Sequence, residues 1–273
     1  MRGDVGVVGL YVYGEGAAST SLEIVRNSTA RKWTGFEVKE AISEWGLRGV
    51  ELLRDRVAAL VIVDVLSFST AVDVVVARGG SVVPFATGDR EAARIASDAT
   101  GALLAEPRET SAKGFSLSPR SLMGIAHGTK LLLPSPNGSR LSLAGGATLV
   151  FTGCLRNAKA VAAAVVAVAG NGAIGVVPAG ELWSDGSLRP AIEDLLGAGA
   201  ILDALDLPLS SEARVARDAF RAAEADLAEV VRGSLSGREL TDRGFEGDIE
   251  LAAAYDVSTA APMLRDGSYQ AAN

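Results

Sequence analysis

The sequence predicts an α/β fold in which helices flank a mainly parallel sheet. Five short apolar runs each end in a carboxylate, a glycine or a turn, and most are separated by segments of helical character. Strands that alternate with helices pair in parallel, and ligand sites of such sheets lie beyond the carboxyl ends of the strands. Of the 273 residues, 48% are hydrophobic but only 5% aromatic, so the core must be mostly Ala, Val and Leu. This length allows one large domain or two lobes.

The first half of the regular chain supplies two strands and two helices. Residues 60–64 are apolar and β-branched until they end in a carboxylate, which is typical of a strand buried on both faces. A helix is expected over 71–78, because two glycines follow it as a stop signal. A second helix is expected over 89–100, and the apolar run 101–106 predicts a strand that a proline breaks at once.

The second half continues the alternation. Strands are expected at 130–139, where apolar residues run into a Pro/Asn/Gly/Ser turn, at 149–154 and at 174–181, with helices at 157–170, 190–205 and 211–232. The helix at 157–170 is nearly all Ala and Val and is expected to be sandwiched, whereas 211–232 has an apolar stripe opposite a charged face. If the five strands are parallel, their polar tips face the same way and converge on one pocket.

Residues 1–38 are expected to be an N-terminal extension, partly disordered or packed peripherally, because Gly, Ser, Thr and Asn dominate much of it. The regular unit then covers 39–273, with two lobes and a cleft between them as one arrangement.

Charge and cysteine content exclude several classes of function. The net charge of −7 and the pI of about 4.9 argue against nucleic-acid binding. One cysteine allows no internal disulfide and fits a reducing cytoplasm. No segment resembles a signal peptide, and the longest apolar run, 161–169, is about half the length of a bilayer span. We therefore expect a cytoplasmic protein without a membrane partner.

The segment from Asp64 to the following helix carries the strongest chemical signal. A carboxylate at a strand end is followed by Ser67, Ser69 and Thr70 and by a helix N-terminus, an arrangement suited to a metal ion beside a bound anion. The alternative is a capping cluster, with Ser67 or Ser69 as N-cap and Asp64 closing a turn.

Three other segments could contribute polar groups. In 136–139, Gly138 lets the backbone approach an anion and Asn137 and Ser139 add donors, although a plain β-turn explains the same residues. The loop 114–119, with Ser118, is similarly ambiguous. Glu193 and Asp194 follow Pro190 in the first turn of a helix, where at most one can face a metal and where both also suit the helix dipole.

Two single residues could act as nucleophiles. Cys154 follows a strand and precedes a helix N-terminus, but the Cys-x5-Arg phosphatase signature is missing because residue 160 is Ala. Alternatively, Cys154 lines a pocket or is an ordinary buried thiol. His127, the single histidine, lacks the Arg-His-Gly context of histidine phosphatases.

Six segments in order resemble the 2-phosphosulfolactate phosphatases, also called ComB-like proteins. They are VDVLSFSTAV, ALLAE, GFSLSP, PNGS, GCLRNAKAVA and VVPAGE…IEDLLGAGAI, and together they span about residues 44–255. The resemblance implies a two-lobed α/β fold, Mg²⁺-dependent hydrolysis of a phosphate monoester in a cleft between the lobes, and a homodimer.

The residues expected at this site fall into three groups. The metal ligands are Asp64 and Glu106 first, with Asp194 or Glu193 third, because Mg²⁺ prefers oxygen ligands and few carboxylates. The expected catalytic residues are Asp64, Ser67, Asn137 and Cys154. The expected substrate-binding residues are Ser69, Thr70, Ser118, Gly138, Ser139, Asn157 and Gly180. Attack by water and attack by a side chain both remain open.

The chain departs from the family pattern at two places. Ser67 stands where the family usually has Arg, and residues 107–110 replace a Gly-rich turn. An Arg at that place is a bidentate donor to phosphate or sulfonate, and Arg108, Arg120 and Arg140 are the candidates to replace it.

The sequence thus predicts a phosphatase that acts on a small phosphorylated carboxylic or sulfonic acid. The alternative is an altered homologue that binds a small anionic metabolite without turnover. A third option is a nucleotide or sugar-phosphate transferase, which the missing P-loop and Gly-x-Gly-x-x-Gly motifs disfavour.

Overall fold

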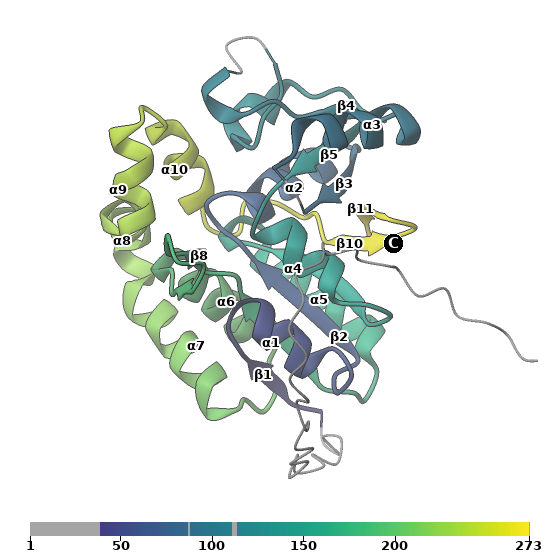
Figure 1. Ribbon diagram of the computed structural model, residues 1–273. Coiled ribbons are helices and arrows are strands. Elements are labelled where there is room, and N and C mark those ends of the chain that lie inside the picture. Colours follow the sequence, from purple (N-terminus) through teal and green to yellow (C-terminus); the bar gives the residue numbers. More distant parts are fainter. Residues whose placement is uncertain (1–38, 87, 111–113, 273) are drawn as a thin grey trace, which may run out of the picture. The chain divides into compact units, whose positions relative to one another are not determined.

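The structure, a computed structural model, describes residues 39–86, 88–110 and 114–272 (Figure 1). These residues belong to one compact unit. The expected extension 1–38 lies outside the described residues. Within the described part, no helix combines the length and the apolar character needed to cross a bilayer.

Nine described strands form one sheet in the order β1-β7-β2-β6-β10-β11-β3-β5-β4. Their bounds are β1 Ala41–Ser43, β2 Ala59–Val63, β3 Ser81–Phe85, β4 Leu103–Leu104, β5 Lys130–Pro134, β6 Leu149–Gly153, β7 Ile174–Pro178, β10 Pro262–Arg265 and β11 Ser268–Ala271. β8 (Glu181–Leu182) and β9 (Leu188–Arg189) form a separate two-stranded sheet.

The large sheet consists of two parallel blocks. β1, β7, β2 and β6 pair in parallel, as do β3, β5 and β4. Between the blocks lies the antiparallel hairpin of β10 and β11, and β10 runs antiparallel to β6 and β11 antiparallel to β3. Three successive antiparallel pairings make the two blocks run in opposite directions. The predicted mainly parallel α/β sheet is therefore confirmed, whereas two separate lobes are not.

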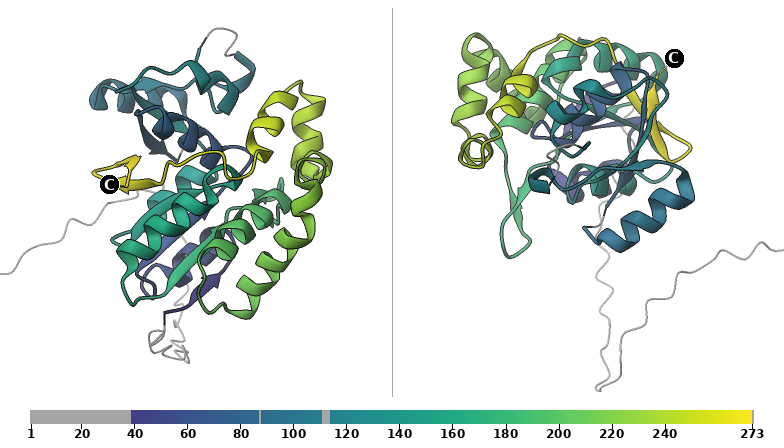
Figure 2. Two further views of the ribbon diagram at one scale, coloured as in Figure 1. Left: turned by 180° about the vertical axis from the view of Figure 1, so that it is seen from behind. Right: turned by 90° about the horizontal axis from the view of Figure 1, so that it is seen from above.

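Helices cover both faces of the sheet (Figures 1 and 2). Their bounds are α1 Gly46–Leu53, α2 Phe68–Ala77, α3 Arg90–Thr100, α4 Gly138–Ala144, α5 Ala158–Ala169, α6 Ile192–Ala204, α7 Ser211–Ala223, α8 Leu227–Gly233, α9 Leu235–Asp242 and α10 Glu246–Ala253. Short 3₁₀ turns are η1 Arg108–Thr110, η2 Pro119–Gly124, η3 Leu155–Asn157 and η4 Glu224–Asp226.

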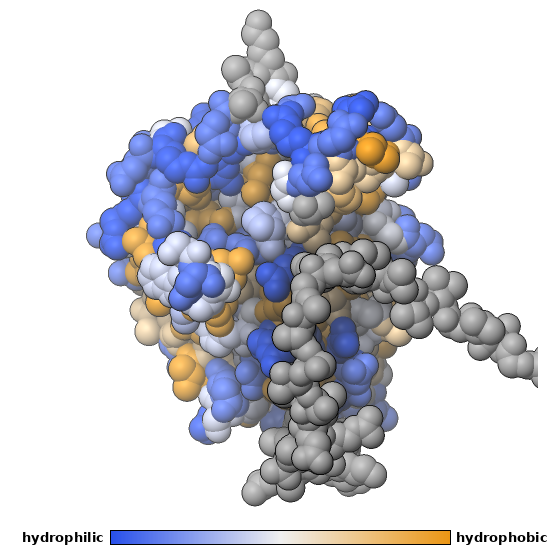
Figure 3. Space-filling model, in the orientation of Figure 1, coloured by the Kyte–Doolittle hydropathy of each residue, from blue (hydrophilic) through white to orange (hydrophobic). Residues whose placement is uncertain are grey.

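The side chains of β2 show how the core is divided. Val61 and Val63 lie in a cluster with residues of α5, α6 and α7, whereas Leu60 and Ile62 lie in a second cluster with residues of α1, α2 and α4. Alternate side chains of a strand point to opposite faces, so an unbroken apolar run serves two cores at once. On the face shown in Figure 3, hydrophilic surface predominates and hydrophobic residues are scattered within it.

Most expected elements are present with modest shifts of their ends, but three differ in their extent. The expected turn at 136–139 includes the start of α4 at Gly138. The expected strand at 101–106 pairs as a strand only at Leu103–Leu104, since Glu106 forms just an isolated bridge with Ser116. The expected single helix 211–232 is divided into α7 and α8 by η4.

Candidate active site

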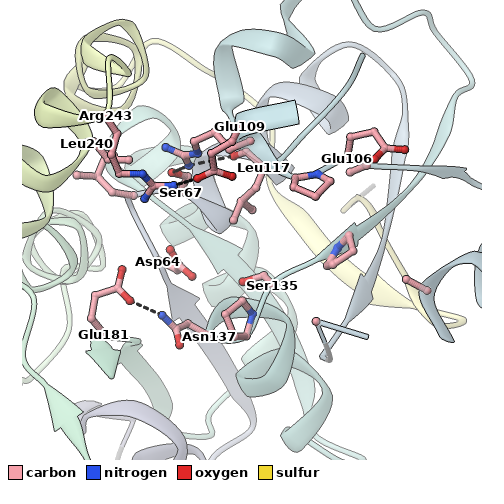
Figure 4. Close-up of a pocket in the computed structure, with 18 of the residues that line it drawn as sticks. Asp64, Ser67, Glu106, Glu109, Leu117, Ser135, Asn137, Glu181, Leu240 and Arg243 are labelled. Carbon is pink, nitrogen blue, oxygen red and sulfur yellow. Dashed lines mark hydrogen bonds and ion pairs between the residues drawn. The ribbon is translucent and has the colours of Figure 1, made fainter. Parts of the chain in front are cut away.

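A cavity of about 360 Å³ lies where the carboxyl ends of β2, β4 and β5 come together (Figure 4). The segments after these three strands form its floor, and the start of α3, the 3₁₀ turn η1 and α9 form its walls. The residues that line it include Asp64, Ser67, Glu106, Arg108, Glu109, Asn137, Glu181, Glu239, Leu240 and Arg243.

Asp64 is fixed at the N-termini of two helices. Its Oδ1 accepts the backbone N–H of Phe68 at 3.1 Å, and its Oδ2 accepts that of Gly138 at 3.0 Å. These residues begin α2 and α4, so the carboxylate faces the positive ends of both helix dipoles. A Cβ at position 138 would lie 2.3 Å from the ring of Phe68, and therefore only glycine lets α4 begin this close.

Glu181 lies next to Asp64 in the cavity. The amide nitrogen of Asn137 donates to Glu181 Oε2 at 2.6 Å, and Figure 4 shows the three side chains grouped together. Burial raises the pKa of Asp64 to about 6, against the lowering effect of its two backbone hydrogen bonds. Burial and then the charge of Asp64 raise the pKa of Glu181 to about 7. The charge of Asp64 thus opposes the ionisation of Glu181.

The oxygen donors of Asp64, Glu181 and Asn137 are of the type that Mg²⁺ prefers. When ionised, the buried carboxylate of Asp64 and the half-buried carboxylate of Glu181 have negative charge that a cation would neutralise. Among the described residues, however, no three His, Cys, Asp or Glu side chains are already gathered as a metal-binding group. The site offers two carboxylates and an amide, which matches a metal that keeps most of its water.

The structure places the other expected metal ligands differently. Glu106 lines the same cavity but forms an ion pair of 2.5 Å with Arg90, on the side away from Asp64 in Figure 4. Asp194 accepts the backbone N–H groups of Val65 at 2.7 Å and Gly180 at 2.9 Å. It therefore ties the start of α6 to the loops after β2 and β7, and its position is away from the cavity lining.

Glu193 also lies away from the cavity lining. It is 2% exposed, and its Oε2 has no hydrogen-bond partner in the described structure. Its charge contributes to the raised pKa values of Asp64 and Asp194, of which burial is the larger cause. Glu193 therefore affects the protonation of Asp64 and Asp194 without lining the cavity.

Most of the expected substrate-binding hydroxyls are used inside the protein. Ser69 Oγ accepts the backbone N–H of Asp64 and shares a hydrogen bond with Thr152, and Thr70 donates to the carbonyl of Val65. Ser139 donates to the carbonyl of Leu133. All three serine and threonine side chains are fully buried. They hold the loop after β2 and the start of α4 in place.

Four further expected residues lie outside the cavity lining. Ser118 donates to Asp248, and Gly180 donates to Asp194. Cys154 is fully buried, and burial raises the pKa of its thiol to about 12, which disfavours a thiolate nucleophile. Asn157 is also buried and accepts the backbone N–H of Cys154 at 2.9 Å.

Of the three candidate arginines, Arg108 is the one in the cavity lining. Its side chain is 7% exposed, its Nη2 donates to Ser67 Oγ at 2.5 Å, and its Nη1 lies 3.1 Å from Asp248. Arg120 is exposed, and Arg140 lines a second cavity instead. His127 is exposed and is not part of either cavity lining.

Sequence reasoning did not select Glu181, Arg243 or Asp248 as site residues. Glu181 could have been found, because it ends the apolar run that continues β7, as Asp64 ends β2. Arg243 and Asp248 lie in a helical region with many charges, where the sequence gives no sign of which charge faces a cavity.

Comparison with known proteins shows the family to which the chain is related. The family model described as 2-phosphosulpholactate phosphatase matches residues 50–267. A protein of Methanothermobacter thermautotrophicus named "2-phosphosulfolactate phosphatase" is 32% identical over 211 residues, which are 76% of this chain and 87% of that protein. Proteins of Carboxydothermus hydrogenoformans and Symbiobacterium thermophilum, both named "Probable 2-phosphosulfolactate phosphatase", are 29% and 28% identical over 75% and 80% of this chain and 85% and 94% of their own length. The chain therefore belongs to the 2-phosphosulfolactate phosphatase family, whose name denotes a phosphoric monoester hydrolase.

Proposed function

We propose that this protein is a Mg²⁺-dependent phosphatase that hydrolyses the phosphate monoester of a small carboxylic or sulfonic acid, such as 2-phosphosulfolactate. The family membership supports the reaction class. The observation that carries the assignment to this cavity is Asp64, which is held by two helix N-termini and faces Glu181.

Asp64 and Glu181 would hold the ion, with Asn137 Oδ1 as a further oxygen donor, because Asn137 bonds Glu181 through its nitrogen. When bound, Mg²⁺ supplies charge that polarises the phosphoryl oxygens and orients a nucleophile. Ser67 accepts a hydrogen bond from Arg108, so its own proton is left to donate to an anionic oxygen of the bound substrate. A hydroxyl polarised by a guanidinium is a stronger hydrogen-bond donor to such an oxygen.

The proposal extends to the setting in which the enzyme works. We expect a cytoplasmic homodimer without nucleic-acid partners, and a role in the biosynthesis of coenzyme M, on the strength of the family resemblance and the acidic composition. Size-exclusion chromatography with light scattering tests the dimer directly.

The reaction is tested by release of inorganic phosphate from 2-phosphosulfolactate and from p-nitrophenyl phosphate. We expect turnover with Mg²⁺ and loss of turnover with EDTA, restored by excess Mg²⁺. Turnover that EDTA leaves unaltered would contradict the metal dependence. Binding of 2-phosphosulfolactate without phosphate release would favour the altered homologue that only binds an anionic metabolite.

A further inference from the structure

The cavity has carboxylates at one end, and guanidinium groups lie at the other end together with Glu109. Asp64 and Glu181 lie together at one end with Asn137, whereas Arg243 lies with Ser67 and Glu109 at the other (Figure 4). Arg108 reaches Ser67 at this second end. A ligand that spans the cavity therefore meets carboxylates at one end and guanidinium groups at the other.

Two of these guanidinium groups share one aromatic ring. The Cζ of Arg108 lies 5.1 Å from the centre of the Phe245 ring, and the Cζ of Arg243 lies 5.6 Å from the same centre. An aromatic face attracts cations, and it holds both planar groups without taking up their N–H donors. We call Arg108, Arg243 and Phe245 the arginine subsite.

Arg108 is the rigid member of the arginine subsite. Its partner Asp248 is 1% exposed and is itself held by the hydroxyl of Ser118 at 2.6 Å and the backbone N–H of Arg120 at 3.2 Å. This network fixes the guanidinium at the cavity wall, where an ordered donor can bind an anion without further loss of entropy.

Arg243 is the adjustable member of the arginine subsite. Its side chain is half exposed and it pairs with Glu109, the neighbour of Arg108 in η1. An exposed ion pair of this kind is weak and is readily exchanged for another anion. Burial lowers the pKa of Arg108 and the positive charge of Arg243 lowers it further, while the charges of Asp248 and Glu109 raise it.

The protein as a whole does not attract anions, so these arginines do not belong to a general positive field. The protein has a net charge of −7, and five carboxylates besides Asp64 belong to the cavity lining: Asp89, Glu106, Glu109, Glu181 and Glu239. An anionic substrate must therefore be held by particular donors. The phosphoryl group needs the carboxylate end with its ion, which leaves the arginine subsite for a second anionic group.

We infer that the arginine subsite binds the carboxylate or sulfonate of the phosphorylated acid while the phosphoryl group lies at Asp64. The inference rests on the proposed function and names the residues that select its substrate class. A cavity of about 360 Å³ suits a small acid of this kind. Arg108 and Arg243 would then determine specificity for a phosphate ester that has a neighbouring acid group.

The kinetic test compares 2-phosphosulfolactate with p-nitrophenyl phosphate, which lacks the acid group. For Arg243→Gln we expect kcat/KM for 2-phosphosulfolactate to fall about tenfold more than kcat/KM for p-nitrophenyl phosphate, mostly through KM. Arg238→Gln is the matched control, because Arg238 is exposed on α9 and is absent from the cavity lining. Equal losses for both substrates would overturn the inference.

A binding measurement separates this inference from the proposed function. Isothermal titration calorimetry with sulfolactate, which has no phosphate to hydrolyse, requires no turnover. We expect wild type and Arg238→Gln to bind sulfolactate equally and Arg243→Gln to bind it about tenfold more weakly. Failure of the wild type to bind sulfolactate, or equal binding by Arg243→Gln, would overturn the inference whether or not the protein hydrolyses phosphate.

Arg108→Lys extends the test to the buried member. Lysine keeps the charge opposite Asp248 but loses the planar fork of guanidinium donors. Thermal unfolding shows whether this variant folds, and a folded Arg108→Lys that binds sulfolactate as wild type does would contradict a role for Arg108.

Discussion

Asp64 combines two properties that a residue at the surface cannot have together. Two backbone N–H groups hold its carboxylate in one orientation, while burial and then the charge of Glu193 raise its pKa. The orientation stabilises the charge and the burial disfavours it. A cation bound in the cavity would stabilise the ionised form of this carboxylate, which is the physical basis of the proposed metal dependence.

The raised pKa values predict how stability depends on pH in the metal-free protein. The pKa values of Asp64 and Glu181, about 6 and about 7, lie above their ordinary values of 3.8 and 4.5. The folded protein thus binds more protons than the unfolded chain, so the free energy of unfolding falls as pH rises from about 4 to about 7. The loss corresponds to about 1.4 kcal/mol for each unit of raised pKa.

Urea unfolding in EDTA at several pH values measures this effect. The variant Asp64→Asn/Glu181→Gln should show a smaller fall of the unfolding free energy between pH 4 and 7 than wild type. The raised pKa values would be contradicted by the opposite result. In that case the unfolding free energy of wild type would rise from pH 4 to pH 7 and that of the double variant would not.

At the scale of elements, periodicity and stop signals predicted the strands and helices that alternate in the middle of the chain. The hairpin of β10 and β11 was not predicted, although its turn residues Asp266 and Gly267 have the positive φ angles and the Asp-Gly sequence typical of such turns. The sequence predicts a turn where α4 starts, because Pro136, Asn137 and Gly138 are common both in turns and at helix starts. Only the packing of Gly138 against Phe68 distinguishes them, and this contact joins distant parts of the chain.

Gly138→Ala should damage the element that presents Asp64. The added Cβ would lie 2.3 to 2.6 Å from atoms of the Phe68 side chain, so α4 and α2 must separate. We expect a loss of about 1 to 3 kcal/mol in unfolding free energy and a lower kcat, measured by urea unfolding and phosphate release. Gly146→Ala is not a clean control, because Gly146 has a positive φ, whereas Gly233→Ala has open space around the new Cβ and should change neither.

At the scale of the whole molecule, the sequence predicted the fold class and several residues that line the cavity, among them Asp64, Ser67, Asn137 and Glu106. The strand tips were expected to face the same way if all five strands were parallel. The two blocks instead run in opposite directions, because the β10–β11 hairpin lies between them and pairs antiparallel with β6 on one side and with β3 on the other. The tips of β2 and β5 nevertheless line the same cavity. Strand order and side-chain direction depend on such long-range contacts. We expected Glu106 beside Asp64, and the structure places Glu181 nearer to it (Figure 4).

Tyr269 links the hairpin to the helices that hold Asp64. It is fully buried, its hydroxyl donates to Ser142 on α4 at 2.7 Å, and its ring lies edge-on to Phe68 on α2 at 6.0 Å between centres. We expect Tyr269→Phe to cost about 1 kcal/mol of unfolding free energy and Tyr269→Ala about 3 to 5 kcal/mol. Equal stability of Tyr269→Ala and wild type in urea would show that the hairpin does not hold the blocks together.

The central claim is that phosphate esters are hydrolysed in the cavity around Asp64. The most direct measurement is the rate of phosphate release from 2-phosphosulfolactate with Mg²⁺, by wild type, by Asp64→Asn and by the exposed control Asp98→Asn, each shown to be folded by thermal unfolding. The account predicts that Asp64→Asn lowers the rate by about 100-fold or more and that Asp98→Asn retains the wild-type rate. A folded Asp64→Asn protein that releases phosphate as fast as wild type would contradict it.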